Sequence, residues 1–299
     1  MMQNPRQALR ELLAKPGIIR AAGVYDGISA RVTEQAGFPM AYLSGAGVAA
    51  GYLGEPDIGL TNGSDVASVC RRIAVKANIP ILVDADTGYG NPLNVVRTMW
   101  DLEMAGAAGI QFEDQAAPKR CGHLNGKQCI STEEFAAKIR AARHECACSD
   151  TVIVARTDAR AVYDLDEALR RGEAYLNAGA DVLFIEAPQS LEEVRRIAET
   201  FRGVPLFTNQ VIGGKTPRLT AEEAGALGYK IIIYPDVLPF AASVLFRRIC
   251  DRILECGHSW DTIPDAPDSR ELFMTMGMKQ WREKEPLYSS GDCKTGKLF

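Results

Sequence analysis

The stretch ILVDADTGYGN, residues 81–91, decides the fold together with GIQFEDQAAPKRCGH, residues 109–123. Each begins with an apolar run of strand length, and each run ends in acidic side chains. Because side chains alternate along a strand, Asp84 and Asp86 are expected on one face, and Glu113 on a neighbouring strand would join them. Carboxylates that end successive buried strands indicate a parallel sheet with its chemistry at one edge.

Similar apolar runs recur along the whole chain, and helical patterns separate them. They are IRAAGV (19–24), MAYLSG (40–45), PILVDAD (80–86), AGIQFED (108–114), TVIVART (151–157), DVLFIEA (181–187), PLFTNQ (205–210) and KIIIYP (230–235). Strands that alternate with helices predict parallel pairing, and continuous Val, Ile and Leu runs predict strands covered on both faces. Eight such units in one chain of 299 residues predict an α/β fold, the (β/α)8 TIM-type barrel.

A doubly wound open sheet is the structural alternative. No G-x-G-x-x-G follows the first run, and Gly-Gly-Lys-Thr at 213–216 is no phosphate loop, because Asn209 stands where its first glycine must be. The barrel is favoured because unusual polar residues lie at the carboxyl ends of the runs, where barrel enzymes place their chemistry. These residues are Ser44, Asp84, Asp86, Glu113, Arg156, Asp158, Glu186 and Asn209.

Bulk composition excludes several classes of protein. With 46% hydrophobic and 24% charged residues the chain reads as globular, and a net charge of −4 gives no reason to expect a nucleic-acid partner. We find no run that spans a bilayer and no secretory signal, so no membrane partner and a cytoplasmic location are expected. The eight cysteines lack regular spacing and do not indicate a disulfide framework.

The chain is interpreted as a single barrel domain over residues 1–299, with 259–299 as a C-terminal helical tail. The helix-forming part, 270–285, has an apolar set that needs a partner surface. Its members are Leu272, Phe273, Met276 and Trp281. We therefore expect a homotetramer, or at least a dimer.

Two clusters carry the candidate chemistry. Asp84, Asp86 and Glu113 are hard oxygen donors without a nearby His or Cys, which suits Mg²⁺, with Mn²⁺ as the alternative. The simpler interpretation is a helix cap or a local salt bridge. Cys121 lies among Lys119, Arg120 and His123, an environment that lowers a thiol pKa, although a lone cysteine is usually a small buried hydrophobe. Its loop contains Gly122 and Gly126 as hinges for a lid that ends where a helix begins near Ser131.

These segments give the chain a family resemblance. The blocks SGAGVAAGYLGEPDIG (44–59), VDADTGYGN (83–91), EDQAAPKRCGH (113–123), VARTDAR (154–160) and NQVIGGKTP (209–217) resemble those of the isocitrate lyase and phosphoenolpyruvate mutase superfamily, in the same order. The KRCGH lid is similar to that of its lyase branch. Within that branch the chain resembles 2,3-dimethylmalate lyase, oxaloacetate hydrolase and carboxyphosphonoenolpyruvate mutase, and somewhat less 2-methylisocitrate lyase.

The resemblance implies a barrel whose last helix is swapped between subunits, in a tetramer built as a dimer of dimers. It implies Asp57 as a further member of the metal shell and Ser44, Gly45 and Ala46 as donors to one end of the substrate. Arg156 is expected to clamp a substrate carboxylate in bidentate fashion. The remaining candidates are Cys121 as general acid, His123 and Glu113 as its catalytic neighbours, and Gly122, Glu186 and Asn209 as further substrate contacts.

The function expected is that of an enzyme, an oxo-acid-lyase that uses Mg²⁺ to cleave a small 2-hydroxy dicarboxylate or tricarboxylate to a 2-oxo acid plus a carboxylic acid. The expected substrates resemble 2,3-dimethylmalate or 2-methylisocitrate. A phosphonate mutase that transfers a phosphoryl group, an oxaloacetate hydrolase and a catalytically silent scaffold stay open as alternatives. The sequence does not separate mutase from lyase.

Overall fold

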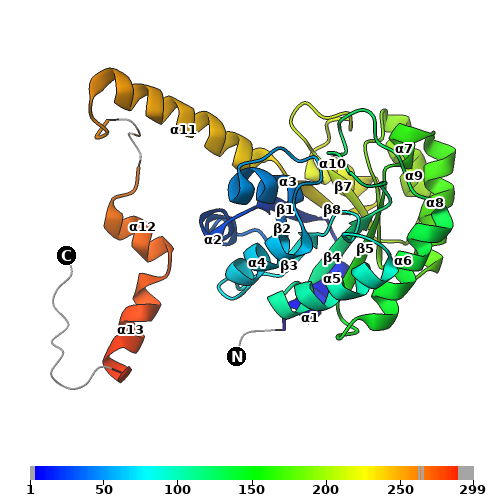
Figure 1. Cartoon of the computed structure of the whole chain (residues 1–299), viewed down its shortest axis with the longest axis horizontal. Helices are drawn as coiled ribbons and strands as arrows, with labels where there is room; N and C mark the ends of the chain where they lie inside the picture. The colour runs from blue at the N-terminus through cyan, green and yellow to red at the C-terminus, as the bar shows by residue number, and fades with distance from the viewer. Residues whose placement is uncertain (1–3, 262, 264–265, 289–299) are drawn as a thin grey trace. The chain divides into compact units, whose positions relative to one another are not determined.

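The computed structural model describes residues 4–261, 263 and 266–288 (Figure 1). The chain divides after Phe240 into two compact units, 1–240 and 241–299, and the boundary lies inside one helix, α11. The first unit holds the barrel and the candidate site.

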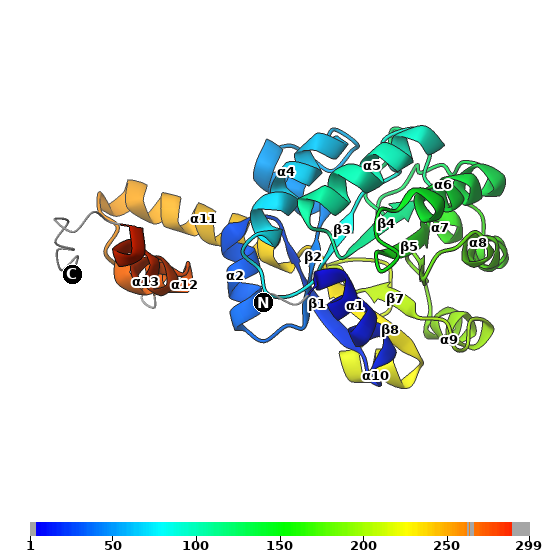
Figure 2. The same cartoon turned by 90° about the horizontal axis from the view of Figure 1, so that it is seen from below.

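The eight predicted strands are confirmed, and they close into a parallel barrel in chain order (Figure 2). Strand β8 pairs with β1, where Ile19 lies opposite Ile231, and this pairing excludes the open sheet. The strands are β1 Ile19–Val24, β2 Met40–Leu43, β3 Ile81–Asp84, β4 Gly109–Glu113, β5 Val152–Thr157, β6 Val182–Ile185, β7 Leu206–Asn209 and β8 Tyr229–Tyr234.

Helices surround the barrel and connect its strands (Figures 1 and 2). In the first unit they are α1 Pro5–Ala14, α2 Gly27–Gln35, α3 Gly45–Val48, the π-helix η1 Ala49–Leu53, α4 Gly63–Ala74, α5 Pro92–Ala105, α6 Thr132–Glu145, α7 Ala159–Val162, α8 Leu165–Asn177, α9 Leu191–Thr200 and α10 Ala221–Ala226. The predicted helix start at Ser131 is confirmed, since its side chain accepts a hydrogen bond of 3.1 Å from the amide of Glu134.

Alternate side chains of the strands pack inside the barrel and against the helices. Val182 and Phe184 belong to a buried cluster that includes Leu9 of α1, whereas Leu183 and Ile185 of the same strand pack with the helical layer. Period-two alternation therefore assigns Phe184 to the barrel interior and Leu183 to the outer face.

The loop between β4 and α6 is tied to itself at its base. Gln115 donates to the carbonyl of Arg120 at 2.8 Å and accepts from its amide at 2.9 Å, and Gln115 and Cys129 form an isolated antiparallel bridge. We call residues 115–129 the lid segment. Its ends are anchored by backbone pairing, so its middle, around Cys121, can be held over the carboxyl ends of the strands.

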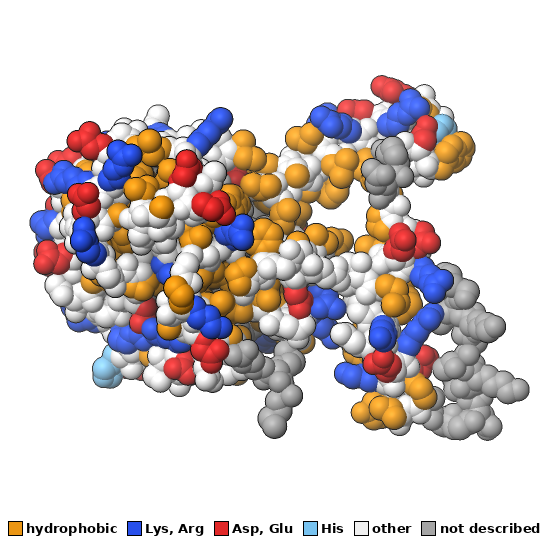
Figure 3. All heavy atoms as spheres, turned by 180° about the vertical axis from the view of Figure 1, so that it is seen from behind, with side chains coloured by type: hydrophobic (Ala, Val, Ile, Leu, Met, Phe, Trp, Pro, Cys, Tyr) orange, Lys and Arg blue, Asp and Glu red, His pale blue; other side chains and the backbone are white. Residues whose placement is uncertain are grey.

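The second unit contains most of α11 Val237–Cys256, followed by α12 Ser269–Thr275 and α13 Met278–Tyr288. The helix-forming part predicted at 270–285 is helical, but it is divided into two helices because Gly277 adopts a left-handed φ of 93° between them. No residue of α11 is buried, and hydrophobic side chains lie along it in Figure 3. Helix swapping and the 259–299 tail stay predictions, and residues 262, 264–265 and 289–299 of that tail lie outside the described residues.

None of the helices in the described residues combines the length and the apolar character that crossing a membrane requires.

Candidate active site

A cavity at the carboxyl ends of the strands gathers most of the predicted site residues. Of the predicted residues it is lined by Ser44, Ala46, Asp57, Asp84, Glu113, Cys121, Gly122, His123, Arg156, Glu186 and Asn209. Gly45 and Asp86 do not line the cavity, but each of them contacts a residue that does. The amide of Gly45 donates to Oδ2 of Asp84 at 3.4 Å, and Asp86 pairs with Lys119, which lines the cavity.

The two aspartates of the first motif are brought together by a turn and not by a strand. The prediction that they share a strand face is wrong, because β3 ends at Asp84 and Asp86 has a left-handed φ of 48°. The turn directs the amide of Asp86 onto Oδ1 of Asp84 at 3.2 Å. A non-glycine residue in this conformation is strained, which is common at functional sites.

Glu113 is fully buried at the end of β4 and has an unusual electrostatic environment. Burial raises the pKa of Glu113 well above its ordinary value, and Arg156, whose Nη1 lies 3.2 Å from Oε2, opposes the shift. Its other oxygen, Oε1, is buried without a hydrogen-bond partner, and so is Oε1 of Gln111. Buried oxygens are rarely left unpaired in proteins, so this pair of atoms marks a place for a cation or an ordered water.

Lys119 places its ammonium group among the predicted metal ligands. Its Nζ lies 2.5 Å from Oδ1 of Asp57 and 2.6 Å from Oδ1 of Asp86, and the second contact is an ion pair without hydrogen-bond geometry. Burial lowers the pKa of Lys119, but the surrounding carboxylates, Asp86 first, raise it well above its ordinary value. Asp57 and Asp86 are therefore charge-balanced by a lysine.

The remaining donors fit Mg²⁺ held partly through water. No three or more His, Cys, Asp or Glu side chains within the described part of the chain converge closely enough to hold a metal by themselves. Asp84 and Glu113 nevertheless line the same cavity, and Glu113 offers an unpaired oxygen. Mg²⁺ usually keeps several waters and takes one or two carboxylates from the protein, which matches this donor set.

Arg156 is the last residue but one of β5 and lies at the centre of an ion-pair network. Its Nε and Nη2 contact the two carboxylate oxygens of Asp158 at 2.9 and 3.1 Å, and its Nε lies 3.5 Å from Oε2 of Glu186. Burial lowers the pKa of Arg156, yet Asp158, Glu113 and Glu186 raise it well above its ordinary value. The fork of Arg156 expected to clamp substrate is thus engaged by Asp158, and Arg156 presents the cavity with a fixed positive charge.

Cys121 lies half-buried in the lid segment, and its predicted environment needs correction. The expected lowering of the thiol pKa is wrong. Burial raises the pKa of Cys121, and the negative charge of Asp57 adds to the shift, although a hydrogen bond from the backbone of His123 lowers it. The neighbouring cations do not reverse this because Lys119 is already paired with carboxylates and so is Arg156. The side chain is therefore a protonated thiol near neutral pH.

His123, Glu186 and Asn209 form a polar group on the opposite wall. Nε2 of His123 lies 3.0 Å from Oε1 of Glu186, and the amide nitrogen of Asn209 donates to both oxygens of Glu186 at 3.2 Å. Burial raises the pKa of Glu186, but Arg156 and His123 outweigh it and lower the pKa to about 2. Glu186 is thus an anion that binds His123 of the lid segment at the end of β6 and Asn209 at the end of β7.

Ser44 begins helix α3, and its hydroxyl oxygen accepts a 3.2 Å hydrogen bond from the amide of Gly47. The cap leaves the hydroxyl hydrogen available to the cavity, as expected of a donor to substrate.

The cavity floor is aromatic. Phe184 stacks on Phe207 with ring centroids 4.6 Å apart, and Tyr42 meets Phe207 edge-on at 5.9 Å.

Sequence reasoning did not assign roles to three residues of this region. Tyr42 lines the cavity, and it could have been found from alternation, two residues before Ser44. Lys119 was seen only as a neighbour of Cys121. Lys127 belongs to the lid segment with its side chain buried, and no local signal distinguishes it from a surface lysine.

Comparison with known proteins identifies the family. The family model for phosphoenolpyruvate phosphomutase matches residues 9–254. The chain belongs to this family. It is 40% identical to 2,3-dimethylmalate lyase of Eubacterium barkeri over 292 residues, which covers 96% of this chain and 99% of the relative. It is 41% identical to a 2-methylisocitrate lyase of Aeropyrum pernix, covering 95% and 91% of the two chains.

A third relative is the chloroplastic carboxyvinyl-carboxyphosphonate phosphorylmutase of Arabidopsis thaliana, 39% identical over 93% of this chain and 83% of the relative. The family therefore includes both lyases and phosphoryl-transferring mutases. The chain is an enzyme of the PEP mutase/isocitrate lyase superfamily, and its relatives named as lyases support a lyase.

Solved structures agree with this family. A 2,3-dimethylmalate lyase structure superposes with a TM-score of 0.92 at 34% identity, covering 99% of both chains. Oxaloacetate acetylhydrolase bound to 3,3-difluorooxalacetate gives 0.91 at 35% identity, covering 95% and 96%. Phosphonopyruvate hydrolase, solved with oxalate and Mg²⁺, gives 0.85 at 31% identity, covering 96% and 99%.

Proposed function

We propose that this chain is a Mg²⁺-dependent carbon–carbon lyase that cleaves a small 2-hydroxy dicarboxylate or tricarboxylate to a 2-oxo acid and a second carboxylic acid. The observation that carries the proposal is a single cavity lined by the Cys121 thiol, the Arg156 guanidinium and the Asp84 carboxylate. About 40% identity to enzymes named as lyases supports the same reaction class.

Cleavage turns the C2 hydroxyl into a carbonyl and leaves the electron pair of the broken bond on the departing carbon. Cys121 delivers its proton to that carbon as general acid, and in the reverse direction its thiolate removes it. Burial raises the pKa of Cys121, so it enters the reaction protonated. Glu113, with one unpaired oxygen and a raised pKa, accepts the hydroxyl proton.

Charge in the cavity is matched to an anionic substrate. Arg156 keeps its positive charge beside the carboxylate of the substrate, and the capped hydroxyl of Ser44 donates to the other end. Asp84 would hold Mg²⁺, with Glu113, Asp86 and Asp57 acting through water, and Mn²⁺ is the alternative. When bound, the ion supplies charge that stabilises developing negative charge on the C2 oxygen.

One panel of substrates tests the proposal. The purified protein is given 2-methylisocitrate, 2,3-dimethylmalate, isocitrate, oxaloacetate or phosphonopyruvate with Mg²⁺, and the 2-oxo acid, or oxalate for oxaloacetate, is measured. We expect turnover of a 2-methylisocitrate-like or 2,3-dimethylmalate-like compound. Cys121→Ser should remove this turnover and still bind oxalate or pyruvate with Mg²⁺, because a hydroxyl is a far weaker acid than a thiol.

Two outcomes would replace the lyase. Turnover of phosphonopyruvate alone would overturn the lyase in favour of a phosphonate mutase, and turnover that survives Cys121→Ser would also overturn it. Oxalate produced from oxaloacetate alone would establish an oxaloacetate hydrolase, the second candidate, which the TM-score of 0.91 to oxaloacetate acetylhydrolase favours.

Helix α11 supports a further proposal on assembly: we infer a homotetramer built as a dimer of dimers, with the last barrel helix exchanged between subunits. What supports it is that α11 has no buried residue.

A further inference from the structure

We propose that Lys127 and Asp158 form a latch that fastens the lid segment to strand β5, so that placing Cys121 over the cavity and orienting Arg156 are one event. The inference rests on the proposed function for its catalytic meaning. In this proposal both are positioning residues that act on the substrate through Cys121 and Arg156.

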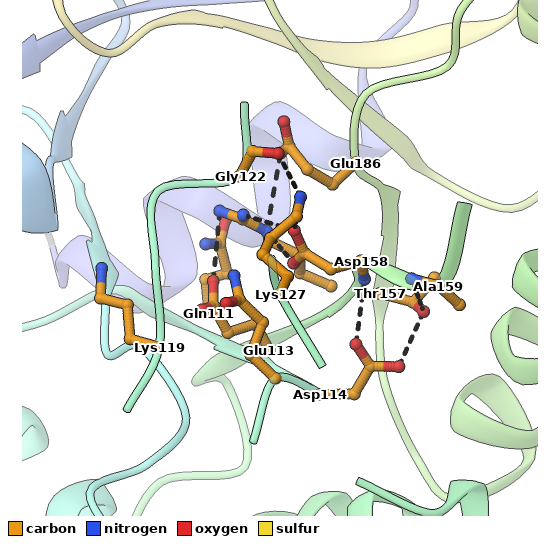
Figure 4. Close-up of polar contacts among 12 residues, drawn as sticks. Gln111, Glu113, Asp114, Lys119, Gly122, Lys127, Thr157, Asp158, Ala159 and Glu186 are labelled. Atoms are coloured by element: carbon orange, nitrogen blue, oxygen red, sulfur yellow. Dashed lines mark hydrogen bonds and ion pairs between the residues drawn. The ribbon is translucent and has the colours of Figure 1, made fainter. Parts of the chain in front are cut away.

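Lys127 reaches from the lid segment into the protein. Its side chain is only 2% exposed, and its Nζ donates to the carbonyl oxygen of Gly122 and, at 2.7 Å, to Oδ1 of Asp158 (Figure 4). Both bonds involve a charged donor, and the partner carboxylate is fully buried. Charge-assisted bonds in such surroundings are the strong ones, so one side chain ties the middle of the lid segment, at Gly122, to Asp158 at the end of β5.

The other end of the latch holds the arginine. Oδ1 of Asp158, which accepts from Lys127, also accepts from Nη2 of Arg156, and Oδ2 accepts from Nε of the same arginine. Burial raises the pKa of Asp158, but Arg156 and Lys127 outweigh it and lower the pKa. Asp158 is itself held in place, because its backbone amide donates a 2.9 Å hydrogen bond to Oδ1 of Asp114.

Gly122 shows why the two ends must move together. A Cβ atom on Gly122 would lie 2.3 Å from Nη2 of Arg156 and 2.8 Å from Cδ of Glu186. The backbone of the lid segment therefore packs directly on the guanidinium and on Glu186. Lys127 holds this peptide by its carbonyl, next to Cys121 in the chain.

Loss of Lys127 would act on two parts of the site. The carbonyl of Gly122 loses its donor, so the lid segment is no longer held against Arg156. Asp158 retains only Arg156 as a cationic partner, and the guanidinium can follow it. A purely electrostatic role would have a different signature, because removing a nearby cation raises a thiol pKa and makes Cys121 less reactive.

The test is the rate at which iodoacetamide alkylates Cys121 in the free protein, followed by mass spectrometry of the peptides, in Lys127→Met, Lys127→Arg and Lys76→Met. Lys76 is an exposed lysine just after α4 and serves as the matched control. Since losing a charge-assisted bond shifts an opening equilibrium about tenfold or more, we expect Lys127→Met to be alkylated about ten times faster than wild type. Lys127→Arg should restore most of the protection, and Lys76→Met should match wild type.

Thermal melting of each variant separates opening of the lid from unfolding, because unfolding would expose every cysteine equally. Adding Asp158→Asn to Lys127→Met should raise the rate little further if the two residues form one latch. Unchanged or slower alkylation in Lys127→Met would overturn the proposal. Alkylation needs no substrate, so this result is independent of whether the lyase assignment holds.

Discussion

The amide of Lys215 donates a 3.0 Å hydrogen bond to Nδ1 of His123. This contact fixes the tautomer of the ring, since a nitrogen that accepts from an amide carries no proton. The proton is therefore on Nε2, which faces Oε1 of Glu186 at 3.0 Å. One histidine thus joins the lid segment to Glu186 on one side and to the loop after β7 on the other.

Two substitutions at His123 separate its contacts. The amide of a glutamine reaches the position of Nε2 and keeps a donor for Glu186, whereas asparagine reaches the position of Nδ1 and keeps an acceptor for Lys215. A buried carboxylate suffers more from a lost donor than a backbone amide near the surface does from a lost acceptor. We expect His123→Gln to retain about tenfold more kcat/KM than His123→Asn. The reverse order would show that the assigned tautomer is wrong.

Gly122→Ala should disable the enzyme without unfolding it. The added methyl group would lie 2.3 Å from Nη2 of Arg156, so the lid segment cannot occupy its present position. Misplacing a catalytic group by about 1 Å costs on the order of 100-fold in rate, and we expect at least this loss in kcat/KM. Gly27→Ala is the control, because a Cβ there meets no atom within 4 Å. Equal activity of both variants would show that turnover does not use the lid position described.

Alkylation of Cys121 should require a higher pH than is usual for a cysteine. Burial and Asp57 raise the pKa of Cys121, so the thiolate, which is the reactive form, becomes abundant only above the ordinary titration range. The rate of alkylation at Cys121, normalised to that of a small free thiol such as N-acetylcysteine in the same reaction, is measured against pH. A midpoint below the ordinary range would restore the original hypothesis of an activated thiolate.

Removal of divalent metal should abolish activity, and Mg²⁺ or Mn²⁺ should restore it. Calorimetric titration of chelator-treated protein with Mg²⁺ measures the site directly. Asp84→Asn should weaken binding by at least about tenfold, because a carboxylate is the stronger ligand for a hard cation. Asp101→Asn, an exposed side chain on α5 that pairs with Arg97, should bind as wild type does. An enzyme that keeps full activity after thorough chelation would contradict the metal assignment.

The assembly prediction is tested by light scattering. Leu272, Phe273 and Trp281 are 37%, 43% and 59% exposed, and none of the residues of α12 or α13 is buried. Apolar side chains of this size normally meet a partner surface, and a second copy of the chain is the expected one. We expect a tetramer at micromolar concentration, and a chain ending at Ser269 should aggregate or form smaller species. A monomeric full-length protein would reject the proposal.

The strands could be predicted because their signals are local. Each apolar run is bounded by its own turn residues, and β1 has its predicted bounds, while the other strands deviate by one or two residues at one or both ends. The carboxylates proposed to hold a metal could be named from the sequence, but their geometry could not be predicted. Asp86 reaches Asp84 through a left-handed turn, and alternation of side chains in a strand carries no information about such a turn.

The electrostatic environment of Cys121 could not be predicted from the residues that adjoin it in the sequence. Lys119 and Arg120 adjoin Cys121 in sequence, but the charge on Lys119 is balanced by Asp57, which lies 62 residues away, and by Asp86. Asp57 also acts on the thiol directly. Lys127 was missed for the same reason, since its partner Asp158 belongs to another strand end. Burial and counter-ions depend on the tertiary structure, and a local pattern reports neither.

The stacked rings of Phe184 and Phe207 beneath the cavity suggest a route to new substrates. Each ring is nearly fully buried, and both belong to strands whose ends also carry Glu186 and Asn209. A shorter apolar side chain at position 207 would remove the support under Phe184 and deepen the chamber from below, while the lid segment above stays unaltered. Directed evolution toward bulkier, more branched acids could therefore begin at these two positions, with compensating stabilisation elsewhere because a buried ring is costly to remove.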